Sequence, residues 1–63
     1  MKIQKISGPL QNVRYFGQKA HTLIGWYEDE DEALSIAEKL TKRNSVRVVL
    51  NDQYYGVYIR SYA

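Results

Sequence analysis

One segment, residues 28–43 (EDEDEALSIAEKLTKR), is the only stretch of the sequence with a clear helical pattern. Its apolar residues recur at the three- and four-residue spacing that places them on one face of an α-helix. They are Ala33, Leu34, Ile36, Ala37 and Leu40. A chain of 63 residues with one amphipathic helix must bury that face against a sheet made from the remaining residues. This segment therefore constrains the fold more than any other feature.

Both ends of the segment favour a helix. Asp29 is expected to be the N-cap residue, and Glu32 three positions later completes a capping-box pattern. Acidic residues begin the segment and basic residues end it, which complements the helix dipole. Asn44 is predicted to end the helix in the left-handed conformation, which asparagine tolerates better than most residues.

The remaining sequence predicts short strands rich in β-branched and aromatic residues and separated by turn residues. Their predicted ranges are Lys2 to Ile6, Leu10 to Phe16, Ala20 to Tyr27, Val46 to Leu50 and Gln53 to Arg60. Gly25 predicts a β-bulge or a close backbone contact, and Trp26 is expected to pack against the helix start. The order of elements predicts an α+β fold, a two-layer sandwich with one helix on a mostly antiparallel sheet of four to five strands (β-β-β-α-β-β). We expect residues 1–63 to form a single domain.

The last hairpin has a predictable register, because a strand alternates its side chains between two faces. The apolar residues of the fourth strand must share a face with those of the fifth, and that face packs on the helix. The two sets are Val46, Val48 and Leu50, and Tyr55, Val57 and Ile59. Only an even-numbered loop, either residues 51–52 or residues 51–54, satisfies this condition. The opposite face is then expected to be bare, with Arg47, Val49, Tyr54, Tyr58, Arg60 and Tyr62 exposed on it.

Composition argues against several classes of protein. The chain has no cysteine, which excludes disulfides and thiolate metal sites and fits a reducing compartment. No apolar run approaches the ~20 residues that span a bilayer, and we expect no signal peptide. These features predict a cytoplasmic protein without membrane contact. The only histidine, His21, is expected at a strand edge, and no phosphate loop or nucleophile motif occurs, so we expect no enzyme, cofactor or metal.

Charge is distributed unevenly along the chain. The net charge is +2, yet five of the seven acidic residues are consecutive. They are Glu28, Asp29, Glu30, Asp31 and Glu32. Outside this acidic segment the chain has nine Lys and Arg residues and only two acids, so the rest of the surface is expected to be positive. The segment either caps the helix and keeps the chain soluble, or binds a basic surface of another protein through complementary charge.

The predicted bare sheet face is the first candidate for a binding surface, because Tyr and Arg are over-represented among residues that dominate binding energy. The expected partner contacts are Tyr54, Tyr58, Arg60, Arg47 and Tyr62 on the sheet, and Glu28, Asp29, Glu30, Asp31 and Glu32 on the helix. A host protein or a second copy of the chain, as a homodimer, fits this face. The opposing interpretation is that tyrosine favours strands and that single exposed aromatic residues carry no function.

Single-stranded nucleic acid is an alternative ligand for the same face. Proteins of that class stack bases on aromatic side chains and hold phosphates with Lys and Arg. The chain supplies both kinds of residue in Tyr54, Tyr58, Arg47 and Arg60, with Lys2, Lys5, Arg14 and Lys19 nearby. However, the RNP sequence pattern of RNA-recognition domains is absent.

Residues 27–40 begin with an aromatic residue, continue with acids and contain DEALSIAE. This segment resembles the helix entry of small phage-encoded inhibitors of bacterial RNA polymerase, in which one helix lies on a small sheet. The resemblance implies a compact, non-enzymatic phage or mobile-element protein that binds and blocks, or modulates, a host protein. Residues 32–60 are also similar to the peptidoglycan-binding SPOR domain, but that domain needs a second helix, which this sequence lacks. Neither resemblance implies a catalytic residue.

Overall fold

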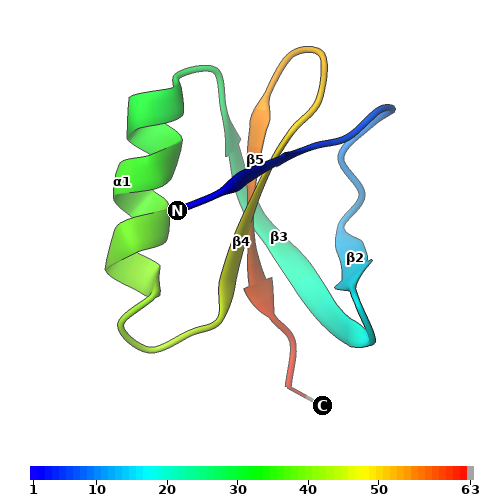
Figure 1. Cartoon of the computed structure of the whole chain (residues 1–63), viewed down its shortest axis with the longest axis vertical. Coiled ribbons are helices and arrows are strands. Elements are labelled where there is room, and N and C mark those ends of the chain that lie inside the picture. Colours follow the sequence, from blue (N-terminus) through cyan, green and yellow to red (C-terminus); the bar gives the residue numbers. More distant parts are fainter. Residues whose placement is uncertain (63) are drawn as a thin grey trace.

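The computed structural model describes residues 1–62 as one helix and one five-stranded sheet (Figure 1). The elements are β1 (Ile3–Lys5), β2 (Val13–Phe16), β3 (Lys19–Tyr27), α1 (Glu30–Leu40), β4 (Val46–Leu50) and β5 (Tyr55–Arg60). The strands lie side by side in the order β1-β4-β5-β3-β2. β1 and β4 are parallel, whereas the other three pairs are antiparallel. The predicted α+β class is therefore confirmed, with a mixed sheet.

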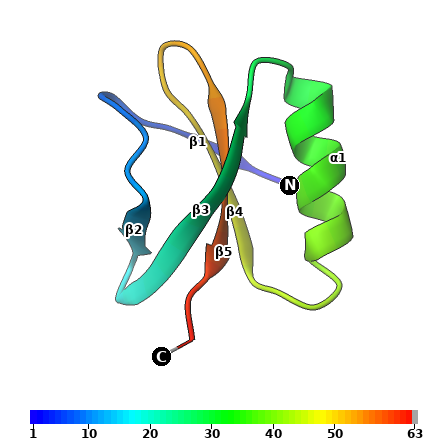
Figure 2. The same ribbon diagram turned by 180° about the vertical axis from the view of Figure 1, so that it is seen from behind.

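The sheet curls into half of a barrel (Figures 1 and 2). Arg47 of β4 lies over the ring of Phe16 in β2, with its guanidinium carbon 5.8 Å from the ring centroid. In the sheet, β5 and β3 separate these two strands. Strands three positions apart in a flat sheet are about 14 Å apart, so this contact agrees with the curl that brings β2 back toward β4 (Figures 1 and 2). The predicted bulge is confirmed between Leu23 and Gly25, where it adds local twist and bending.

The helix face of the sheet holds the main core. At its centre, two alanines of α1 meet two valines of the sheet, and each of the four exposes no more than 1% of its surface. They are Ala33, Ala37, Val48 and Val57. The small alanine side chains let the helix backbone approach the strands closely. Val48 pairs with Val57, and the loop is residues 51–54, so the predicted hairpin register is confirmed with the longer of the two loops.

The second face of the sheet, turned away from α1, is also covered in its central part, so the prediction of a bare face is wrong there. Tyr58 exposes none of its surface. Its ring meets Phe16 edge-on at a centroid distance of 5.7 Å, and its hydroxyl donates a hydrogen bond of 2.6 Å to the carbonyl oxygen of Gln11. Val49 is fully buried on the same face. A second copy of the chain cannot reach these two side chains. Of the predicted fold, the α+β class is confirmed and the two-layer sandwich is not.

The strand order explains why the second face is covered. β1 and β2 follow one another in the sequence but form opposite edges of the sheet. Their connection, residues 6–12, must cross one face, and α1 occupies the other (Figure 1). The Ile6 amide donates to the carbonyl oxygen of Leu50 at 2.9 Å where the crossing starts. Where it ends, the Leu23 amide donates to the carbonyl oxygen of Asn12 at 2.8 Å.

The helix is shorter than the predicted segment 28–43. Asp29 is its N-cap residue, as predicted, but the Asp29 side chain makes no capping hydrogen bond. The predicted left-handed Asn44 is wrong, since only glycines have positive φ among the described residues. Asn44 instead satisfies the end of the helix with two donors: its side-chain Nδ2 and its amide bond the carbonyl oxygen of Leu40 at 3.2 and 2.9 Å.

The burial of Tyr58 gives a direct test. We expect Tyr58→Phe to lower the free energy of unfolding by about 1 kcal/mol, because it removes the donor to Gln11 and keeps the ring. Tyr58→Ala should lower it by about 3–5 kcal/mol, the usual range for deleting a buried aromatic ring. Urea unfolding followed by circular dichroism checks both values. Tyr62→Phe, at an exposed tyrosine, is the matched control and should change stability by less than about 0.5 kcal/mol; similar small effects of all three would contradict the buried position.

Candidate functional site

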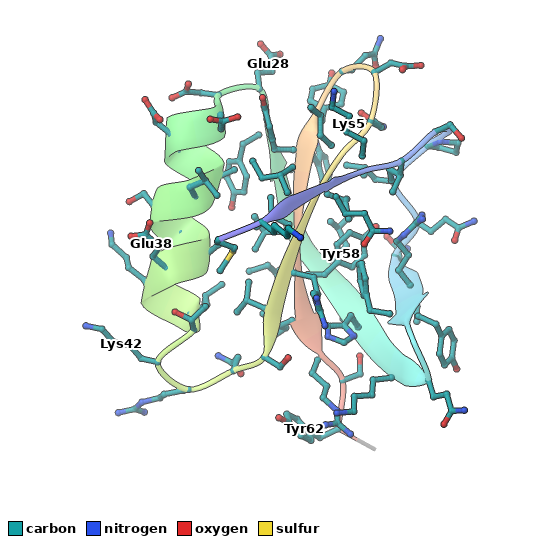
Figure 3. All side chains as sticks on the ribbon, viewed as in Figure 1. Lys5, Glu28, Glu38, Lys42, Tyr58 and Tyr62 are labelled. Atoms are coloured by element: carbon teal, nitrogen blue, oxygen red, sulfur yellow. The ribbon has the colours of Figure 1, made fainter. Side chains whose placement is uncertain are left out.

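The structure divides the predicted contact residues between two ends of the molecule instead of collecting them on one surface. Glu28 lies at one end and Tyr62 at the opposite end (Figure 3). The acidic segment 28–32 is exposed throughout. Tyr54 is half-buried in the β4–β5 loop, and this loop lies at the Glu28 end (Figure 3). Tyr58 lies between the two ends and has no surface for a partner.

The remaining two predicted residues belong to the Tyr62 end. Arg60 lies over the ring of Tyr62, with its guanidinium carbon 5.3 Å from the centroid. Arg47 is exposed on the same face of the sheet. The structure therefore brings Arg47, Arg60 and Tyr62 together and separates them from the acidic segment.

A cleft of about 340 Å³, here called the Trp26 cleft, opens on the second face beside the β4–β5 loop. The connection between β1 and β2, the strand β3 and the β4–β5 loop form its walls. It is lined by Pro9, Leu10, Asn12, Leu23, Trp26, Asn51, Gln53 and Tyr54. Trp26 exposes 61% of its surface. Its neighbour across the strands is Gly56, which is buried beneath the side chains of Leu10 and Leu23.

Trp26 does not pack against the helix start, so that prediction is wrong, and the bulge is the reason. In a regular strand, residues 24 and 26 would lie on the opposite face from Leu23. The extra residue between Leu23 and Gly25 shifts this alternation by one. Leu23 pairs with Tyr58, and Trp26 pairs with Gly56, so both side chains lie on the second face. Gly25 was the available signal, but the sequence did not show at which residue the alternation changes.

Asn51 fixes the loop wall of the cleft. Its side-chain Oδ1 accepts hydrogen bonds from the amides of Gln53 and Tyr54 at 2.9 and 2.8 Å. Its Nδ2 donates to the carbonyl oxygen of Gly8 at 3.1 Å. One side chain thus connects the β4–β5 loop to the connection between β1 and β2, and sets the distance between two walls.

The Glu28 end is negatively charged. Asp52, exposed in the β4–β5 loop, adds a sixth acid to the five of the acidic segment at this end. The hydroxyl of Tyr55 donates to Oε1 of Glu30 at 3.3 Å. Desolvation raises the pKa of Tyr55, and the negative charge of Glu30 raises it further. Any ligand of the Trp26 cleft therefore approaches through a negative potential.

The Tyr62 end is basic and aromatic. Arg14 pairs with His21, and His21 pairs with Arg60, so their side chains form one row across β2, β3 and β5. His21 is buried in this row, not at an exposed strand edge as expected, and its ring meets Phe16 at a centroid distance of 4.9 Å. Its Nδ1 donates to the carbonyl oxygen of Lys19 at 3.0 Å, while its buried Nε2 has no hydrogen-bond partner. Arg14 and Arg60 thus lie on either side of the buried His21, which packs against the ring of Phe16.

The hydrogen bonds of the Asn51 side chain can be tested by substitution. Asn51→Ala should lower the free energy of unfolding by about 1–3 kcal/mol, because it removes the hydrogen bonds that the side chain accepts and the one that it donates. Asn51→Asp keeps the accepting oxygen and should lower the free energy of unfolding by about 1 kcal/mol. Amide hydrogen exchange should accelerate at Gln53 and Tyr54 in the alanine variant only. Asp52→Ala is the control and should leave both amides protected. Unchanged protection in Asn51→Ala would show that Asn51 does not hold the wall.

No group of three or more His, Asp or Glu side chains gathers in a metal-binding arrangement within residues 1–62. The one helix of that region is too short and too polar to cross a membrane. Comparisons of the chain with protein-family models, with curated proteins and with solved structures find no match.

Proposed function

We propose that the chain is a small, non-enzymatic protein-binding domain, and that the Trp26 cleft binds a basic segment of its partner. The observation that carries this proposal is the exposed indole of Trp26, which lines the cleft and lies two residues before the acidic segment. Tryptophan is among the residues most enriched where binding energy concentrates. A large exposed ring beside a preformed hollow gains most from a partner that covers it.

The chemistry of the cleft defines the partner. A Lys or Arg side chain over the indole face gains about 0.5–2 kcal/mol from the cation–π interaction. The acidic segment attracts the same positive groups and increases the rate of association. The amide side chains of Asn12 and Gln53 at the cleft offer both donors and acceptors to a partner backbone. An extended basic segment with apolar contacts satisfies all three features.

The proposal extends to the biological role that the sequence resemblance implies. The chain acts as a phage or mobile-element protein that inhibits or modulates a host protein in the cytoplasm. A basic host segment that normally contacts nucleic acid is the natural target, because closely spaced carboxylates present charge of the same sign as phosphates. A domain of 63 residues acts by occupying such a surface.

Affinity capture from a bacterial lysate, with quantitative mass spectrometry, tests this function. Trp26→Ala should deplete the specific partner at least about tenfold, the loss expected when a hot-spot tryptophan worth ≥ about 1.4 kcal/mol is removed. Glu28→Gln combined with Asp31→Asn should deplete the same protein, because the charge is removed without altering the N-cap. The complex of the unsubstituted chain should survive moderate salt, since the indole contact is not screened.

Tyr15→Ala provides the matched control. Tyr15 is an exposed aromatic residue of β2 outside the cleft lining, and its replacement should leave the captured protein unchanged. If Trp26→Ala captures the same proteins in the same amounts as the unsubstituted chain, the cleft is not the interface and the proposed function fails.

A further inference from the structure

We propose that the Tyr62 end of the second face binds single-stranded nucleic acid, separately from the Trp26 cleft. The site is a set of five cations, here called the basic crescent. They are Lys2, Arg14, Lys19, Arg47 and Arg60. The crescent draws on four strands and on the residue before β1. The curl of the sheet brings Arg47 of β4 over the ring of Phe16 in β2.

Strand pairing places the cations on the same face. Arg14 and Arg60 both pair through His21, so they share its face, and Lys19 joins them by the two-residue alternation of β3. Arg47 shares the face of its pairing partner Tyr58. Lys2 and Arg47 line a common hollow of about 330 Å³ beside β1.

The charge of the basic crescent is not neutralised along the chain. All seven acids belong to the acidic segment, to Glu38 or to Asp52, and none lies in residues 1–27 or 53–63. Glu38 projects from α1, away from the second face, and Glu28 lies at the far end (Figure 3). Burial raises the pKa of Tyr58, and the positive charge of Arg14 opposes that rise. A cationic surface of this kind attracts an anionic ligand.

Two of the arginines are already oriented by aromatic rings. Arg47 lies over Phe16 and Arg60 over Tyr62. A guanidinium has five N–H donors, and those that do not face the ring can bond phosphate oxygens. Arg14 and Arg60 are two strands apart, about 10 Å, so they contact different phosphates of one strand.

The exposed ring of Tyr62 favours nucleic acid over other polyanions. It exposes 73% of its surface beside Arg60. An exposed tyrosine next to a phosphate-binding arginine offers a stacking surface for an unpaired base. Duplex DNA is usually read by an inserted helix or strand pair, but α1 lies on the other face of the sheet. These features together point to an unpaired strand.

Fluorescence anisotropy with a fluorescein-labelled oligothymidine of about 10 nucleotides tests the proposal. We expect saturable binding that weakens about 20-fold between about 50 and 200 mM NaCl, the change for about three phosphate contacts on a single strand. Arg14→Gln combined with Arg60→Gln should weaken binding at least about tenfold and flatten the salt dependence. Tyr62→Ala should weaken it about fivefold or more through lost stacking.

Matched variants separate a site from general attraction. Lys42→Gln combined with Arg43→Gln removes the same charge at exposed residues beyond α1 and should change affinity less than about twofold. Lys2→Gln combined with Arg47→Gln, at exposed positions, repeats the test if the first double variant fails to fold. Trp26→Ala should leave oligonucleotide binding unchanged.

Several outcomes overturn the proposal. One is the absence of saturable oligothymidine binding at low salt, and another is an equal loss of affinity in the crescent variants and in the Lys42/Arg43 variant. The others are tighter binding of a duplex of the same length than of oligothymidine, and an affinity for labelled polyglutamate equal to that for oligothymidine. The last result would assign the crescent to an acidic polypeptide.

Discussion

The structure depends on the crossing of the second face by residues 6–12. β1 and β2 are consecutive but form opposite edges of the sheet, so the chain between them has to pass over the strands. A chain of 63 residues buries only about 60% of the surface that it exposes when unfolded, and it has no cysteine for a disulfide. The crossing segment covers the second face of the sheet, so no second helix is needed there. Tyr58, held between Phe16 and the carbonyl oxygen of Gln11, fixes it in place.

This crossing also creates the two surfaces. Near Asn51 it meets the β4–β5 loop without filling the space beside Trp26, and the Trp26 cleft remains. At the other end of the face β2 folds back toward β4, where Phe16 packs against Tyr58 and Arg47 lies over the ring of Phe16. Both surfaces therefore follow from one feature of the topology, the placement of the consecutive strands β1 and β2 at opposite edges of the sheet.

The sequence predicted what local pattern controls. The position of the helix, the α+β class and the register of the β4–β5 hairpin follow from apolar spacing over a few residues, as does the bulge at Gly25. The strand order does not follow from such local spacing, because the pairing of β1 with β4 joins residues more than 40 positions apart. Without knowledge of the strand order, the sequence predicts Tyr58 to be exposed. The Trp26 cleft was missed because one bulged residue reverses the face of every later side chain in β3.

The opposite charges of the two ends raise the question of whether they cancel. The longest extent of the molecule is 30 Å, and Glu28 and Tyr62 lie at opposite ends of that axis (Figure 3). The Debye length is about 10 Å at 0.1 M salt, so exposed charges separated by most of that axis are screened from one another by the solvent. The acidic segment therefore does not neutralise the basic crescent, and each end keeps its own potential toward an approaching ligand. A partner protein with a basic segment and a nucleic acid strand would be held at opposite ends without competing for the same residues.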